Sequence, residues 1–204
     1  TRFMQGEALR DAKGNIIRSI QYVLGTRLDT HVAKLEMDHR AYFHQVFPEI
    51  LERFMGACEA IQFLHEHDEM HGDICRDHLL VERGTGAYRW IDFDYAYEAT
   101  ENRFGLDVCG LGNILVFLVG KWNYSRQILA EFNFDPDLVA RLRPEDFGLV
   151  YSNRVVNLQK LFPYVPDALN NVLLHFSAAA EVFYTTVDEL LADLEPCRRL
   201  LVAA

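Results

Sequence analysis

The stretch from residue 106 to residue 119 limits the possible folds of this 204-residue chain more than any other feature. It is apolar at nearly every position, so a helix formed here has no polar face to turn towards water. It contains Gly112 and Asn113 and is too short to cross a bilayer. The stretch therefore predicts a helix buried at the centre of a helical domain.

Further helices are expected around this buried one. Apolar side chains recur at helical spacing from Ile50 to Leu64, directly after Pro48, which predicts a long helix there. A helix over residues 187–201 is expected near the end of the chain, and Thr186 with Glu189 has the pattern of a capping box at its start. Shorter helices are expected over residues 29–35, 124–132, 136–141 and 166–180, and a strand over 15–23.

Two acidic residues flank a predicted β-hairpin. Its strands are expected at 79–81 and 88–91, joined by a glycine-containing turn. Asp73 lies before the first strand and Asp92 directly follows the second, so antiparallel pairing brings both carboxylates to the same end of the ribbon. Converging carboxylates suit metal-assisted or acid–base chemistry. The alternative is that each one caps a turn or pairs with an arginine.

The residues around these carboxylates resemble those of a known family. Residues 71–81, HGDICRDHLLV, resemble a kinase catalytic loop with its following strand, and 91–94, IDFD, resemble the metal-binding aspartate motif. Residues 20–28 resemble the hinge between kinase lobes, 107–115 the start of the central helix, and 184–194 the closing helix. In this order they make the chain similar to the C-terminal lobe of a protein-kinase-like phosphotransferase. Its His-Gly-Asp form is similar to that of aminoglycoside and choline kinases.

The resemblance implies a mainly α fold, a protein-kinase-like C-lobe with a small β-hairpin carrying the catalytic loop. Residues 1–25 would then be a remnant of an N-lobe strand and hinge, and residues 26–204 the C-lobe. Nothing in the chain matches the Gly-rich loop, the strand lysine or its glutamate partner, and only about 20 residues precede the hinge-like segment. The chain as it stands is expected to hold half of a nucleotide site, either within a longer enzyme or as a kinase relic that binds without catalysis.

The resemblance also assigns roles to individual residues. Asp73 would be the catalytic aspartate that orients the attacking hydroxyl, and Asp92 would hold magnesium against the phosphates of ATP. Backbone groups of Gln21 and Val23 would contact the adenine edge. Asp107 would cap the central helix and brace the catalytic loop. His71 would pack behind the loop without a chemical role.

Two further positions differ from the family pattern and bear on the metal. His78 occupies the place of the second metal ligand, normally Asn, and imidazole suits manganese or zinc better than magnesium. Asp94 replaces the glycine of the metal motif, and its carboxylate either joins the metal shell or is exposed. We therefore expect ATP with Mg²⁺ or Mn²⁺ as cofactors, and Asp92, His78 and Asp94 as candidate metal ligands.

The short connection between Asp92 and Asp107 limits which class of phosphate acceptor is expected. Only 14 residues separate Asp92 from Asp107, and they contain no Ala-Pro-Glu motif. Protein kinases place a long activation segment there, so a peptide held in the usual way is not expected, although the hydroxyl acceptor could be a protein or a small molecule.

A histidine-rich segment, residues 65–71, has some of the side chains of a separate metal site. It comes close to H-E-x-x-H, but Glu69 stands in place of the second histidine, and Met70 breaks the alternative H-x-H-x-D-H pattern. The segment is therefore expected to be a polar helix end followed by a turn.

Composition narrows the partners and the setting. A net charge of −10 argues against nucleic acid, although metal ions can neutralise a bound nucleotide. The four cysteines are scattered, as expected for free thiols in a reducing cytosol. With no signal peptide or membrane span, a soluble cytoplasmic protein is expected.

Two functions remain open: an ATP-dependent phosphotransferase, and a pseudokinase-type binding or regulatory module.

Overall fold

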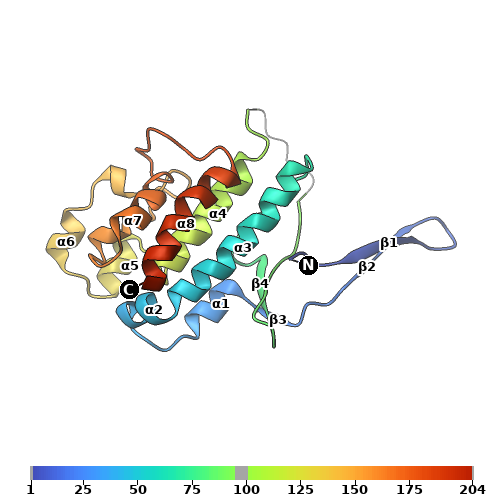
Figure 1. The fold of residues 1–204 in the computed structure, drawn as a ribbon, viewed down its shortest axis with the longest axis horizontal. Coiled ribbons are helices and arrows are strands. Elements are labelled where there is room, and N and C mark those ends of the chain that lie inside the picture. The colour runs from blue at the N-terminus through green and yellow to red at the C-terminus, as the bar shows by residue number, and fades with distance from the viewer. Residues whose placement is uncertain (1, 95–100, 204) are drawn as a thin grey trace.

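The computed structural model describes residues 2–94 and 101–203. Its helices pack into one body, and its strands form two separate small sheets to one side of that body (Figure 1). The helices are α1 (Leu28–Ala33), α2 (His39–Gln45), α3 (Phe47–Glu66), α4 (Gly105–Gly120), α5 (Arg126–Glu131), α6 (Pro136–Ala140), α7 (Asp167–Leu174) and α8 (Val187–Ala203). The strands are β1 (Gly6–Arg10), β2 (Ile16–Ile20), β3 (Gly25–Arg27), β4 (Leu79–Glu82) and β5 (Tyr88–Trp90), and short 3-10 turns cover Pro144–Asp146 and Leu158–Lys160.

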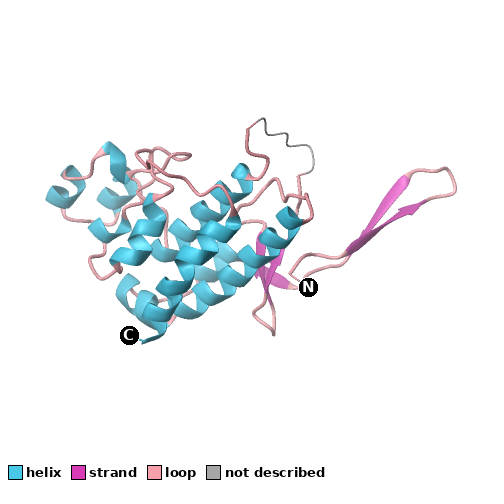
Figure 2. Cartoon of the chain, turned by 45° about the horizontal axis from the view of Figure 1, so that its top comes forward, coloured by secondary structure: helices cyan, strands magenta, loops and turns pink. Residues whose placement is uncertain are grey.

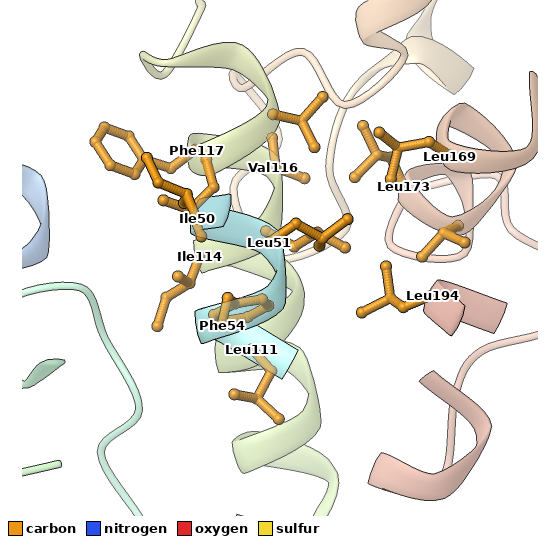
Figure 3. Packing of buried hydrophobic residues seen from close by; sticks show 14 of the residues in the cluster. Ile50, Leu51, Phe54, Leu111, Ile114, Val116, Phe117, Leu169, Leu173 and Leu194 are labelled. Carbon is orange, nitrogen blue, oxygen red and sulfur yellow. The ribbon is translucent and has the colours of Figure 1, made fainter. Parts of the chain in front are cut away.

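Helix α4 forms the centre of the core, as its sequence predicts. Leu111 and Leu115 of α4 are completely buried. Figure 3 shows α4 side chains packed against those of α3, with α7 and α8 completing the layer. The labelled side chains in that view are Ile50, Leu51, Phe54, Leu111, Ile114, Val116, Phe117, Leu169, Leu173 and Leu194. A helix that is apolar nearly all round is stable here because most of its side chains are buried among those of other helices.

The predicted hairpin is confirmed and gains a third strand. Strand β4 pairs antiparallel with β5 on one side and with β3 on the other, giving the order β3-β4-β5. Leu79 lies opposite Trp90, and both are completely buried. The Trp90 indole Nε1 donates to the carbonyl of Ala57 in α3 at 3.0 Å, so this sheet is fixed to the long helix as well as packed on it. Figure 2 shows the sheet against the helical body.

The second sheet is a two-stranded hairpin that extends away from the body (Figures 1 and 2). Strand β1 pairs with β2, and every residue of both strands is exposed. Its turn is shaped by Asp11, whose side chain accepts from the backbone of Lys13 and Asn15, and by Gly14 at φ 83°. The predicted strand over 15–23 is therefore shorter, Ile16–Ile20, and its partner β1 was not predicted.

One further predicted helix differs from the structure in extent, one helix was not predicted, and two predicted helix ends are confirmed. The helix expected over 166–180 ends at Leu174, after which the chain turns so that Ser177 forms a bridge with Gly148. Helix α2 was not predicted. The capping box at the start of α8 is confirmed, because Thr186 Oγ1 accepts from the backbone of Glu189 and the Glu189 carboxylate accepts from the backbone of Thr186. The helix end expected at 65–71 is also confirmed, since α3 ends at Glu66 and Asp68 adopts φ 59°.

All four cysteines are free thiols, as expected from their spacing, with Cys58 and Cys197 buried and Cys75 and Cys109 half-buried. Among residues 2–94 and 101–203, no helix combines the length and the apolar character that crossing a bilayer requires.

Candidate functional site

The loop that precedes β4, residues 71–78, is held from behind by a buried carboxylate. Asp107, in the first turn of α4, is almost completely buried and accepts from the backbone N–H groups of His71 and Gly72 at 2.8 and 2.9 Å. His65 Nε2 lies 3.0 Å from the same carboxylate and stacks on Phe104. The predicted bracing role of Asp107 is confirmed. The predicted capping role is wrong, because the residue at the N-cap is Phe104, with no side-chain cap.

Two glycines allow the loop to approach its neighbours closely. Gly72 adopts φ 79°, a region that L residues with side chains rarely occupy, and a Cβ there would collide with the carbonyl oxygen of Asp94. Gly110 of α4 lies directly against Ile74. The glycine of the His-Gly-Asp sequence thus has a physical reason: it lets the loop lie against the segment that follows β5.

His71 packs behind the loop, as predicted. It is completely buried, stacks on Phe93 with ring centroids 4.5 Å apart, and meets Trp90 edge-on. Its Nδ1 accepts from the backbone N–H of Asp73 at 3.3 Å. Burial lowers the pKa of His71, so the ring is neutral and acts as an apolar and hydrogen-bonding support.

The structure brings Asp73, His78 and Asp92 together at one end of the β4–β5 ribbon. His78 directly precedes β4, and its carbonyl accepts from the backbone of Ile91 at 3.0 Å, which sets Asp92 beside it. His78 Nδ1 lies 3.3 Å from Asp73 Oδ2 and 3.0 Å from the Asp73 carbonyl oxygen, while His78 Nε2 lies 4.0 Å from Asp92 Oδ2. The predicted convergence of the two carboxylates is seen, with an imidazole between them.

Asp92 has an unusual backbone. Its φ is 55°, in the left-handed region, where a non-glycine residue costs on the order of 1 kcal/mol or more. The side chain is nevertheless exposed and faces His78. Strain of this kind is concentrated at functional sites, where surrounding structure enforces it. Here the enforcing contacts are the Ile91 hydrogen bond before it and the Asp94 N–H donated to the His71 carbonyl at 2.9 Å after it.

Cys75 belongs to the same cluster, and the sequence analysis did not single it out. Its Sγ, a carboxylate oxygen of Asp73 and a ring nitrogen of His78 all lie within 4.8 Å of one another. Burial raises the pKa of Cys75, which is a thiol at neutral pH. The spacing D-x-C-x-x-H, read as three metal-binding side chains, is the signal that would have identified it.

The remaining predicted site residues are Asp94, Gln21 and Val23. Asp94 is exposed, directly after Phe93, and its role as a metal ligand stays a prediction. Gln21 and Val23 lie in the connection between β2 and β3, where the Gln21 N–H donates to the carbonyl of Gln5 at 2.8 Å. Their contact with adenine also stays a prediction. This connection leads into β3, where Arg27 pairs with Asp77 of the loop at 3.3 Å.

Comparison with known proteins gives a fold and no family. No family model matches the chain, and no curated protein matches it. A solved structure that is similar is the kinase domain of PknI from Mycobacterium tuberculosis, crystallised as a double mutant, with a TM-score of 0.61. The chain has a kinase-like fold. The match covers 97% of this chain and 72% of the PknI chain at 13% sequence identity, a level at which it speaks for the fold alone. The division into an N-lobe remnant and a C-lobe stays a prediction.

Proposed function

We propose that this chain is the catalytic lobe of an ATP-dependent phosphotransferase that acts on a hydroxyl acceptor. The observation that carries the proposal is the meeting of Asp73, His78 and Asp92 at the end of the β4–β5 ribbon, on a loop braced by the buried Asp107. The kinase-like fold supports it. In this proposal residues 1–25 supply a strand and hinge, and residues 26–204 supply the lobe.

Asp73 would receive the proton of the attacking hydroxyl. Its carboxylate is half exposed, so an acceptor can reach it from solvent. The hydroxyl oxygen forms a bond to the γ-phosphorus of ATP, the bond to the β–γ bridging oxygen breaks, ADP leaves, and the hydroxyl proton passes to Asp73. Because the loop backbone is tied to Asp107, the carboxylate is held in place before substrate binds, which lowers the entropy cost of the reaction.

Asp92 and His78 lie close to the spacing of two ligands of one divalent ion. Metal–oxygen and metal–nitrogen bonds of about 2.1 Å place neighbouring ligand atoms roughly 3.0 to 3.4 Å apart. His78 Nε2 lies 4.0 Å from Asp92 Oδ2, so the two atoms have to approach by less than about 1 Å to share an ion. When bound, such an ion would neutralise charge on the phosphates. A mixed carboxylate and imidazole set favours Mn²⁺ over Mg²⁺. Asp94 is a further candidate ligand from the neighbouring backbone.

The nucleotide and the acceptor complete the proposal. Backbone groups of Gln21 and Val23 would contact the adenine, on the connection that leads into β3. The 14-residue spacing between Asp92 and Asp107, part of which lies outside the described residues, favours a small-molecule hydroxyl over a peptide.

The second candidate is a pseudokinase-type module that binds a partner without transferring phosphate. One observation favours it. His78 occupies the position where kinases normally have an Asn as the second metal ligand, and its ring lies between the carboxylates of Asp73 and Asp92. In that case the site would bind nucleotide weakly or not at all.

A pair of aspartate variants separates the two. Asp73→Asn in the full-length protein should lower ADP formation from ATP by about 10²- to 10⁴-fold, the usual contribution of a general base, while ATP binding stays unchanged. Asp77→Asn is the matched control, because Asp77 lies in the same loop but faces Arg27. Equal ADP formation in Asp73→Asn and wild type would refute the enzyme proposal.

A further inference from the structure

The catalytic-loop cluster contains three different metal-binding side chains within six residues. Asp73, Cys75 and His78 offer a carboxylate oxygen, a sulfur and an imidazole nitrogen, all within 4.8 Å of one another. This set differs from the oxygen-rich ligands that Mg²⁺ prefers. A thiolate, an imidazole and a carboxylate together are typical of zinc.

The distances suit a tetrahedral ion after a small movement. Zinc bonds of about 2.0–2.2 Å to oxygen and nitrogen place two ligand atoms roughly 3.4 Å apart, and Asp73 Oδ2 lies 3.3 Å from His78 Nδ1. Cys75 Sγ has to move closer by up to about 1.2 Å from a separation of at most 4.8 Å, since a zinc–sulfur bond of about 2.3 Å places it roughly 3.6 Å from the other two ligand atoms. Cys75 is half-buried, so its thiol is partly accessible to an ion from solvent.

The two ring nitrogens of His78 face different groups, so its two tautomers place the proton in different surroundings. With the proton on Nδ1, it donates to the carbonyl of Asp73 at 3.0 Å and leaves Nε2 free towards Asp92. With a metal on Nδ1, the proton moves to Nε2 and faces the Asp92 carboxylate at 4.0 Å. A metal-bound histidine that gives its other N–H to a carboxylate is a common arrangement at zinc sites.

We propose that Zn²⁺ binds Asp73, Cys75 and His78, and that this binding switches the phosphotransfer site off. Binding displaces the thiol proton of Cys75 to solvent and leaves one coordination position for water. The ion occupies the carboxylate that would receive the hydroxyl proton, and it leaves a proton on His78 Nε2, the nitrogen that would otherwise bind the nucleotide's metal. Zinc binding itself needs only these three side chains; the inhibitory effect rests on the proposed phosphotransfer function.

Cobalt substitution tests the site without any assay of activity. The full-length protein, titrated with Co²⁺ under reducing conditions, should develop a thiolate-to-cobalt charge-transfer band that Zn²⁺ removes. Cys75→Ser should abolish the band, and Cys109→Ser should keep it, because Cys109 is the other half-buried thiol and lies on α4. His78→Asn should weaken Zn²⁺ binding by more than about 10-fold, since even the loss of a hydrogen-bond partner of a ligand costs about 10- to 100-fold.

The remaining outcomes each decide the proposal. No thiolate band in the wild type, or a band that survives Cys75→Ser, would overturn the zinc site whatever the enzyme does. Where ADP formation is measurable, Zn²⁺ added at saturating Mn²⁺–ATP should inhibit the wild type and spare Cys75→Ser. Equal inhibition of both would overturn the switch. Absence of ADP formation in the wild type counts against the phosphotransferase proposal alone, because the cobalt result is read independently.

Discussion

The two small sheets of this protein differ in what lies behind them. The β3-β4-β5 sheet rests on α3 through buried Leu79 and Trp90, and the loop in front of it is tied to Asp107. The β1–β2 hairpin has longer strands, of five residues each against three or four, yet both of its faces are exposed. An isolated two-stranded hairpin is marginally stable in water. Site residues converge beside the β3-β4-β5 sheet because that sheet has a buried face and an internal anchor. The β1–β2 hairpin has neither among the described residues.

Removing Asp107, the internal anchor of the loop before β4, should cause the largest loss of stability. Asp107→Ala leaves the N–H groups of His71 and Gly72 buried without an acceptor, and each such group costs about 1–3 kcal/mol. We expect a loss of about 3–5 kcal/mol in the free energy of unfolding. Chemical denaturation at neutral pH measures it.

The matched control for that experiment is Asp38→Ala, which removes the side-chain cap of α2. Asp38 accepts from the backbone N–H of Ala41 at the exposed start of the helix, and such a cap contributes about 1 kcal/mol. Equal losses in the two variants would mean that Asp107 is an ordinary helix-terminus residue and that the loop is not anchored.

The helical body should lose stability in acid through His39. This residue stacks on Phe162 and lies 2.8 Å from both the Tyr164 hydroxyl and the Val119 carbonyl, and burial lowers its pKa from 6.5 to about 4. Between pH 6.5 and 4 the unfolded chain binds a proton that the folded chain refuses, so stability falls as pH falls through that window. The expected loss is about 2 kcal/mol after allowance for partial exposure.

Thermal unfolding at pH 7 and pH 4.5 measures this loss, with His39→Gln as the comparison variant. The loss of stability between pH 7 and pH 4.5 should be smaller in His39→Gln than in the wild type, because the variant lacks the imidazole that titrates. An unchanged difference would assign the acid sensitivity to other groups.

The hairpin should show the smallest effect. Ile17→Ser, in the middle of β2, removes a side chain that is about half exposed and does not belong to the hydrophobic core of the described residues, so we expect a change below about 0.5 kcal/mol. Val81→Ser, in β4, is the matched substitution in the other sheet, where the side chain is buried. A large effect of Ile17→Ser would show that the hairpin folds against a surface of its own and would remove the contrast between the two sheets.

The sequence predicts well where one physical signal dominates. The all-apolar stretch of α4, the helical spacing of α3 and the capping box at Thr186 and Glu189 each leave few alternatives. The meeting of Asp73 and Asp92 follows from antiparallel pairing alone. These elements hold the core and the centre of the candidate site.

The sequence fails where tertiary contacts decide. Helix α2 is short and carries polar residues among its apolar ones, so its pattern is weak; it is fixed by contacts such as the Tyr42 hydroxyl donated to the Leu118 carbonyl. The helix expected over 166–180 ends at Leu174 because Ser177 bridges to Gly148. The contact of His65 with Asp107 was missed because the fold brings together two residues that are far apart in the sequence. Cys75 was missed for another reason, since the local spacing D-x-C-x-x-H already places it beside Asp73 and His78.

Calorimetry of ATP binding tests whether Asp92 holds a metal–nucleotide complex. The full-length protein is titrated with ATP without metal, then with Mg²⁺, then with Mn²⁺, in the wild type, in Asp92→Asn and in the control Asp77→Asn. We predict binding that requires metal, is tighter with Mn²⁺, is lost in Asp92→Asn and is retained in Asp77→Asn. An absence of binding with either metal, or binding that Asp92→Asn leaves unchanged, would contradict the account.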